Sequence, residues 1–196
     1  MGLAINTIRA ACEFYSRGYF ENMEKVCDLG CQELYINQEN FYKVLKSYGI
    51  NFNNKNFPNI SNNRSPYIER DSSKEFWKLL GFKNHFCTDI KETHGAIYLD
   101  LNEEFKNKKF LGEFDLVTDF GNNEHPFNTA EAYRTMHRLC KKGGLLWINQ
   151  FLKGGNGFYN YDLSYFESIA AVNKYEIIGS YLMVPLNAQN HENDTL

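Results

Sequence analysis

The feature that most constrains the fold is the alternation of short apolar runs with segments of helical spacing. Helical spacing, in which apolar residues recur every three or four positions, covers 5–19, 41–48, 75–80, 130–139 and 163–172. Short apolar runs typical of buried strands cover 25–30, 84–90, 96–101, 114–120, 145–150 and 175–184. Strands that alternate with helices indicate an α/β domain with a mostly parallel sheet.

One domain is expected over 1–196, because a chain of 196 residues without an internal repeat is typical of a single core. The segment 51–72 contains an asparagine-rich stretch and predicts a surface loop, either a plain insertion or a functional lid. Ser72-Ser-Lys-Glu75 has the pattern of a capping box that opens the helix over 75–80. Residues 185–196 form a polar tail.

Composition excludes several classes of protein. The formal charge is −3 and the basic residues are scattered, so no nucleic-acid partner is expected. No window approaches the roughly 18 apolar residues of a membrane span, and Arg9, Glu13 and Arg17 interrupt the start of the chain, so neither a membrane partner nor a secretory signal is expected. The five cysteines are odd in number and widely spaced, which predicts reduced thiols and a cytoplasmic location.

Carboxylates recur where the expected strands end: Asp28, Asp89, Asp100 and Asp119. Because ligands bind outside the carboxyl ends of parallel strands, these acids are expected at one rim. An acid after the second strand can accept both hydroxyls of a ribose, and one after the third can accept from an adenine amino group. The sequence has neither GxxxxGK[ST] nor GxGxxG, so the pattern predicts a pocket for an adenosine without phosphates.

These segments resemble the class I S-adenosylmethionine-dependent methyltransferases. Val26-Cys-Asp-Leu-Gly30 is similar to the first motif of that family, and the segment 114–125 resembles its fourth strand with the following Glu-His pair. The segment 139–147 resembles the helix end, glycine pair and fifth strand, while 95–102 and 155–159 resemble a bacterial subgroup with small-molecule substrates. The resemblance covers about 25–182 and implies a Rossmann-like three-layer α/β/α sandwich.

The resemblance also implies the role of each site residue. The cofactor S-adenosyl-L-methionine would be held by Asp28, Gly30, Gln32, Asp89, Asp100, Leu101, Asp119 and Gly121. Glu124 and His125 would face the acceptor, with His125 as a general base for a hydroxyl or amine. The implied activity is methyl transfer to a small-molecule acceptor.

Two departures from the family keep alternatives open. Gly30-Cys-Gln32 stands where the family has glycine-x-glycine, and the sheet is expected to lack its last edge strand, which would allow a homo-oligomer. A catalytically inactive binding or scaffold module on the same fold is therefore the main alternative. A nicotinamide-dependent dehydrogenase ranks lower, because GxGxxG is missing.

Several candidate residues also have structural interpretations. Asp28 and Asp100 are compatible with capping or turn roles, and Glu124 with a place at the start of the following helix. An aromatic group after the fifth strand is compatible with either an acceptor wall or core: Phe158, Tyr159, Tyr161, Tyr165 and Phe166. A metal site at His85, Cys87 and Asp89 is the weakest of these hypotheses.

Overall fold

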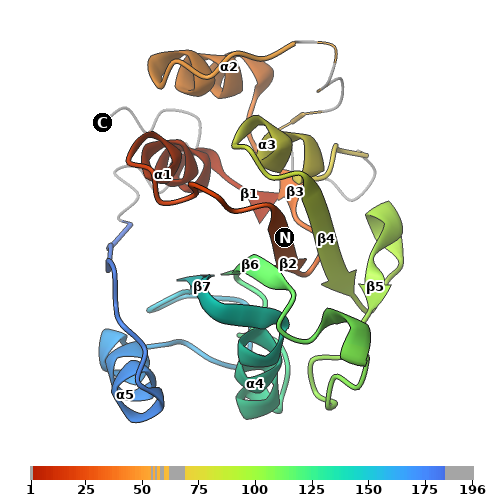
Figure 1. Cartoon of the computed structure of the whole chain (residues 1–196), viewed down its shortest axis with the longest axis vertical. Coiled ribbons are helices and arrows are strands. Elements are labelled where there is room, and N and C mark those ends of the chain that lie inside the picture. The colour runs from red at the N-terminus through yellow and green to blue at the C-terminus, as the bar shows by residue number, and fades with distance from the viewer. Residues whose placement is uncertain (1, 54, 56, 58–59, 62–68, 184–196) are drawn as a thin grey trace.

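The structure is a computed structural model that describes residues 2–53, 55, 57, 60–61 and 69–183. Its centre is a five-stranded parallel sheet with the order β5-β4-β2-β6-β7 (Figure 1). The strands are β2 (Lys25–Leu29), β4 (Asn84–Asp89), β5 (Ile97–Tyr98), β6 (Phe114–Phe120) and β7 (Cys140–Asn149). A small parallel pair, β1 (Gly2–Leu3) and β3 (Glu33–Leu34), lies apart from this sheet.

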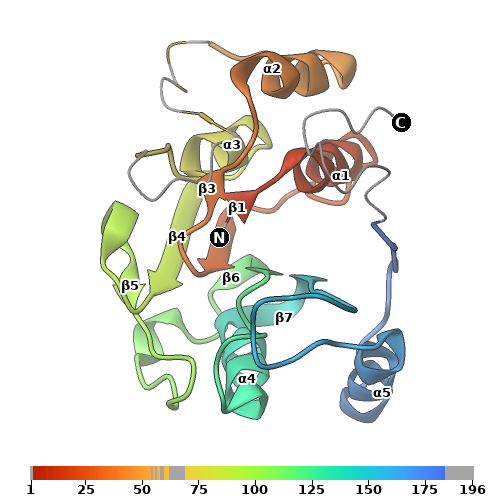
Figure 2. The ribbon, with the colours of Figure 1, turned by 180° about the vertical axis from the view of Figure 1, so that it is seen from behind.

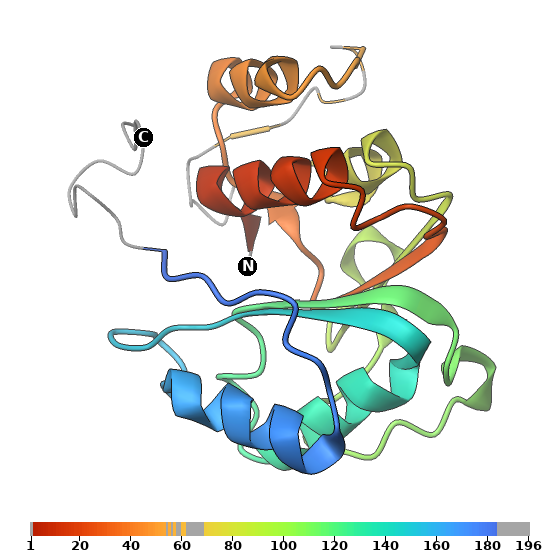
Figure 3. The same cartoon turned by 60° about the vertical axis from the view of Figure 1, so that its left-hand side comes forward.

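Helices cover both faces of the sheet. On one face lie α1 (Ile5–Ser16), α2 (Gln38–Ser47) and α3 (Lys74–Leu79), and on the other lie α4 (Thr129–Leu139) and α5 (Leu163–Asn173) (Figures 2 and 3). Short 3₁₀ segments occur at Thr93–Gly95 and Lys108–Phe110. The expected Rossmann-like α/β/α sandwich with a parallel sheet is confirmed.

The strand period of two divides the core into two parts. In β2, Val26 joins the core under α1–α3, whereas Cys27 and Leu29 join the core above α4. In β6, where all the residues are buried, Leu116 and Val117 face opposite cores in the same way. Because side chains alternate, Asp28 is directed toward the α1–α3 face.

Three sequence predictions about elements are wrong in part. The predicted strand over 96–101 is reduced to β5, and the described part of 175–184, residues 175–183, contains no strand. Residues 175–183 are exposed throughout, and within the described part of the chain no strand pairs with them. The predicted capping box is also absent, because Ser73 is the N-cap of α3 and its hydroxyl donates to Asp28 instead.

Other predicted segments are described only partly. The loop predicted over 51–72 lies partly outside the described residues, and the tail over 185–196 lies wholly outside them. Within the loop, Phe57 is fully buried, with its ring centroid 4.9 Å from that of Phe41 in α2. In the described ranges, no helix combines the length and the apolar character required to cross a membrane.

Candidate functional site at the carboxyl ends of the strands

The strand order reverses between β2 and β6. From β2 the chain extends the sheet through β4 to β5, and from β6 it extends the sheet the other way to β7. Ligands of open α/β sheets bind at such a switch point, outside the carboxyl ends of the strands. Gly30 follows β2 with φ +74°, and Gly121 follows β6 with φ +77°.

Close contact between the two loops requires the glycine at position 30. A Cβ added there would lie 2.1 Å from Asn122 Nδ2, and that amide donates a hydrogen bond to the Leu29 carbonyl. Gln32 Nε2 donates to the same carbonyl over 3.1 Å. The Gln32 side chain is therefore held at the switch point, where its Oε1 is buried without a hydrogen-bond partner.

Asp119, at the end of β6, is fully buried and anchors the loop that follows it. Its Oδ1 accepts the backbone N–H groups of Asn122 and Asn123 over 2.9 and 3.2 Å, and its Oδ2 accepts from Gln150 Nε2 over 2.6 Å. Burial raises the pKa of Asp119 to about 6, against the effect of these hydrogen bonds.

Glu124 is the most unusual side chain of the site. It is 1% exposed, and neither carboxyl oxygen has a hydrogen-bond partner among the residues that the structure describes. Burial, with the nearby Asp119 charge, raises the pKa of Glu124 to about 7. His125 Nε2 lies 3.6 Å from Glu124 Oε1, a distance beyond a hydrogen bond. A buried carboxyl without donors is costly to ionise, so this group favours a proton or a cationic ligand.

The loop after β7 covers Glu124. Phe158 donates its N–H to the Glu124 carbonyl over 2.7 Å, and a Cβ added at Gly157 would lie 2.6 Å from Glu124 Cγ. The alternative that Glu124 begins the next helix is wrong, because α4 starts at Thr129 with Asn128 as its N-cap. The neighbouring His125 side chain is 42% exposed, and burial lowers its pKa.

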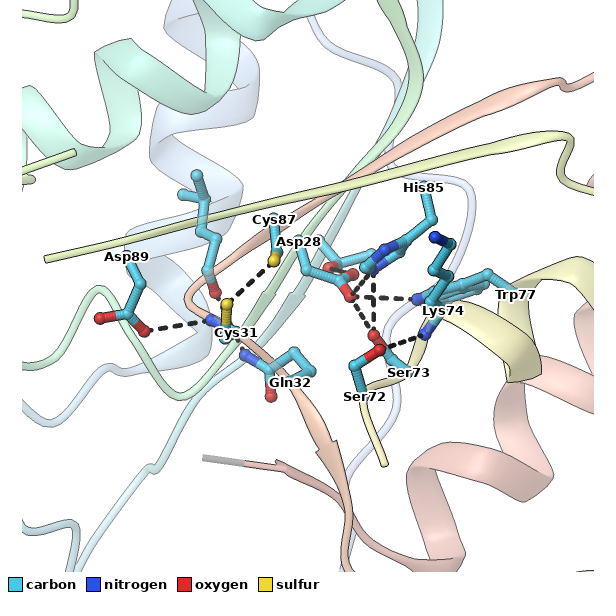
Figure 4. A network of polar contacts seen from close by, with 12 residues as sticks. Asp28, Cys31, Gln32, Ser72, Ser73, Lys74, Trp77, His85, Cys87 and Asp89 are labelled. Atoms are coloured by element: carbon cyan, nitrogen blue, oxygen red, sulfur yellow. Dashed lines mark hydrogen bonds and ion pairs between the residues drawn. The ribbon is translucent and has the colours of Figure 1, made fainter. Parts of the chain in front are cut away.

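Asp28 lies at the centre of a buried polar network on the α3 side of the sheet (Figure 4). Its Oδ2 accepts from Ser73 Oγ over 2.6 Å and Trp77 Nε1 over 3.1 Å, and lies 2.9 Å from His85 Nε2. Thr118 Oγ1 donates to its Oδ1 over 2.5 Å. Every contact named here is with protein, so the network fixes α3 to β2, and contact of Asp28 with a cofactor stays a prediction.

The serine, histidine and aspartate of this network do not form a nucleophilic triad. Ser73 Oγ and Asp28 Oδ2 both contact the same His85 nitrogen, Nε2, over 3.1 and 2.9 Å. A triad needs one nitrogen for the nucleophile and the other for the acid. The arrangement is therefore structural.

The remaining predicted cofactor residues lie at the end of β4 and after β5. Asp89, the last residue of β4, accepts the Cys31 N–H with its Oδ2 over 3.2 Å, which connects the loop after β2 to β4. Asp100 Oδ1 accepts from the backbone and side-chain nitrogens of Asn102 over 2.8 and 2.9 Å, so it makes the turn expected in its structural interpretation. Leu101 packs against the core above α4.

Two residues of the site, Gln150 and Asn122, were not predicted from the sequence. The strand-end rule does find Gln150, because this residue directly follows β7.

The residues of the predicted aromatic group lie in different environments. Phe158 is 73% exposed and lies beside Phe127, whereas Tyr161 is buried and donates to the Asn123 carbonyl. Within the described ranges, no cluster of three or more histidine, cysteine or acidic side chains is arranged to hold a metal ion.

Two surface hollows lie away from the switch point, one beside 46–52 and one near the amino ends of β2 and β4 at Glu24 and Lys83. The polar side chains of Gln32, Asp119 and Glu124 at the switch point are buried. Among known proteins, no family model matches this sequence, and no curated protein matches it.

Proposed function

We propose that the chain binds S-adenosyl-L-methionine at the switch point and transfers its methyl group to a small-molecule hydroxyl or amine. The observation that carries the proposal is a set of buried acceptor oxygens, in the segments that follow β2, β6 and β7, for which the described residues provide no hydrogen-bond partner. They are Gln32 Oε1, both carboxyl oxygens of Glu124, and Gln150 Oε1.

A cationic ligand satisfies these groups better than an anionic one. Buried acceptors without donors cost free energy, and a ligand with N–H donors recovers it. S-adenosylmethionine carries an ammonium and a sulfonium, whose positive charges suit Glu124 and Asp119. A nicotinamide dinucleotide would bring a pyrophosphate to the same two acids, so this charge pattern disfavours the dehydrogenase alternative.

Other residues fit the same ligand. Gly30 allows the backbone to approach closely at the switch point, and Asp89 is the last residue of β4, where a carboxylate can accept ribose hydroxyls. The resemblance to class I methyltransferases implies the same two positions. Asp28 contributes by holding α3 against β2 beneath the site.

Methyl transfer from a sulfonium requires little chemical activation by the protein. When bound, S-adenosylmethionine would supply a methyl group already activated by its sulfonium, so the chain's task is alignment of acceptor and methyl group. His125 Nε2 is partly exposed next to Glu124, and its lowered pKa keeps it neutral at pH 7. A neutral imidazole at this place can accept the proton of the acceptor. Residues 157–158 must move off Glu124 for a ligand to enter.

Calorimetric titration at pH 6 and pH 8 tests the proposal. Because Glu124 has a pKa of about 7, its ionised fraction, and with it the affinity for S-adenosylmethionine, is expected to rise about tenfold between these pH values. Glu124→Gln should remove this tenfold change and leave at most the about twofold change that Asp119, with a pKa of about 6, contributes between the same pH values. Glu167→Gln, on the exposed face of α5, should leave the whole pH dependence unchanged.

The comparison ligands separate the alternatives. S-adenosylhomocysteine shares the ammonium and should bind with the same pH dependence, and NAD should not bind. If neither sulfur nucleoside binds at either pH, the methyltransferase proposal is refuted and the inactive binding module remains. Binding of NAD alone would support the dehydrogenase.

A further inference from the structure

Two cysteines from neighbouring strands meet beside the switch point. Cys87 lies in β4, opposite Asp28 in the β2–β4 pairing, and Cys31 follows β2. The turn at Gly30 directs Cys31 toward β4, where Asp89 accepts its N–H. As Figure 4 shows, the two sulfur atoms face each other, 2.9 Å apart.

The contact is buried but lies at the end of the sheet. Cys31 is 8% and Cys87 5% exposed. The Cys31 thiol also lies 3.0 Å from the Thr93 carbonyl, so Cys87 can donate to Cys31 while Cys31 donates to Thr93. Among the described residues, the two cysteines belong to no group of three or more histidine, cysteine or acidic side chains that could hold a metal ion.

We propose that Cys31 and Cys87 form a redox-active dithiol that closes to a reversible disulfide when a hydroperoxide oxidises it. The two thiols are separated by 56 positions in the sequence, so the bond would tie the loop after β2 to β4. This inference concerns the thiols alone and does not depend on the methyltransferase proposal.

The two thiols differ in acidity, as the attacking and the resolving cysteine of a redox pair must. The hydrogen bond with Cys87 lowers the pKa of Cys31, whereas that same hydrogen bond and burial raise the pKa of Cys87. The thiolate is the nucleophile, so Cys31 reacts first and Cys87 resolves the product.

With hydrogen peroxide, the simplest hydroperoxide, the oxidation takes two steps. The Cys31 thiolate attacks one oxygen of hydrogen peroxide, the O–O bond breaks, and a sulfenic acid and a hydroxide form; the hydroxide takes up the proton that the Cys31 thiol released, giving water. The Cys87 sulfur then attacks the Cys31 sulfur, the S–O bond breaks, and the Cys87 proton leaves with the hydroxide as a second water. Two thiols are oxidised and one peroxide is reduced.

The other cysteines lack these properties. Burial raises the pKa of Cys12 to about 12 and that of Cys140 to about 11, and it raises the pKa of Cys27 well above its ordinary value. No sulfur–sulfur contact is found for these three among the described residues. They serve as internal controls.

The test uses the full reduced chain, treated with hydrogen peroxide and then alkylated. Peptide mass mapping should show two of the five thiols lost and a Cys31–Cys87 link, with fragmentation separating Cys31 from Cys27, and dithiothreitol should restore all thiols. Cys140→Ser should form the same link. Cys31→Ser and Cys87→Ser should not form it.

A second measurement identifies the thiol that reacts first. In Cys87→Ser, a sulfenic acid at Cys31 should accumulate and be trapped by dimedone, whereas in Cys31→Ser, Cys87 should not be labelled. Five free thiols after oxidation of the wild-type chain would overturn the proposal. So would a link between other cysteines, or labelling of Cys87 in Cys31→Ser.

Discussion

Replacement of Glu124 by glutamine should change how stability depends on pH. The folded state raises the pKa of Glu124 from 4.5 to about 7, so the folded chain binds this proton more tightly than the unfolded chain does. The stabilisation from the bound proton is complete below the unfolded pKa and is lost as pH rises through the folded pKa. A shift from 4.5 to 7, at about 1.4 kcal/mol per unit, corresponds to about 3 kcal/mol.

Glutamine resembles the protonated acid in size and cannot ionise. Below the unfolded pKa the variant and the wild type should therefore be similar in stability. Above the folded pKa of about 7 the variant should be more stable, and the difference in free energy of unfolding should grow by about 3 kcal/mol across that interval. Subtracting the two curves removes the groups that titrate alike in both proteins.

Urea unfolding from pH 4 to pH 8, followed by the fluorescence of Trp77 and Trp147, measures this difference. Glu167→Gln is the matched control, because Glu167 is exposed on α5 and its replacement should give a flat difference. A flat difference for Glu124→Gln would refute the reasoning, because it would mean that Glu124 is already ionised at no cost in the folded chain.

The remaining predictions concern the fixed backbone and the buried network. Both Gly30 and Gly49 have positive φ, so replacement of either by alanine should cost about 1–2 kcal/mol of folding free energy. Gly30→Ala should cost more than Gly49→Ala, because of the two only Gly30 has a side chain, that of Asn122, within 4 Å of the added Cβ. Urea unfolding of the two variants measures the difference. Ser73→Ala should lower stability by about 1–3 kcal/mol, because it removes a buried hydrogen-bond donor to Asp28. Ser72→Ala should cost less than about 1 kcal/mol, because it removes only the 3.4 Å contact of Ser72 Oγ with the Lys74 N–H. Thermal melts that show equal losses for the two variants would contradict this.

The sheet was predictable where the strand signal is local. The runs that became β2 and β6 are short, largely apolar and followed by glycine, and both strands are almost wholly buried. The run that became β4 is more polar and only partly buried. The predicted strand over 175–184 has a similar composition but no strand in its described part. A strand needs hydrogen-bond partners from another segment, and composition does not supply them.

The same limit applies to the Ser72–Glu75 pattern. Local spacing predicted a capping box, yet Ser73 Oγ donates to Asp28, 45 positions earlier in the chain. A buried carboxylate needs hydrogen-bond donors, and the fold supplies them from segments that are distant in the sequence. This nonlocal requirement took precedence over the local motif.

The sequence by itself determined that the carboxylates end the strands and that parallel strands bring those ends to one rim. Only the tertiary structure decided which way each side chain points: Asp28 into the core at α3, Asp89 toward the β2 loop, and Glu124 under residues 157–158. The contact of Cys31 with Cys87 is of the same kind. The periodicity of neighbouring residues indicates which segments form strands and helices. Strand order, burial and side-chain partners depend on packing between segments far apart in the chain.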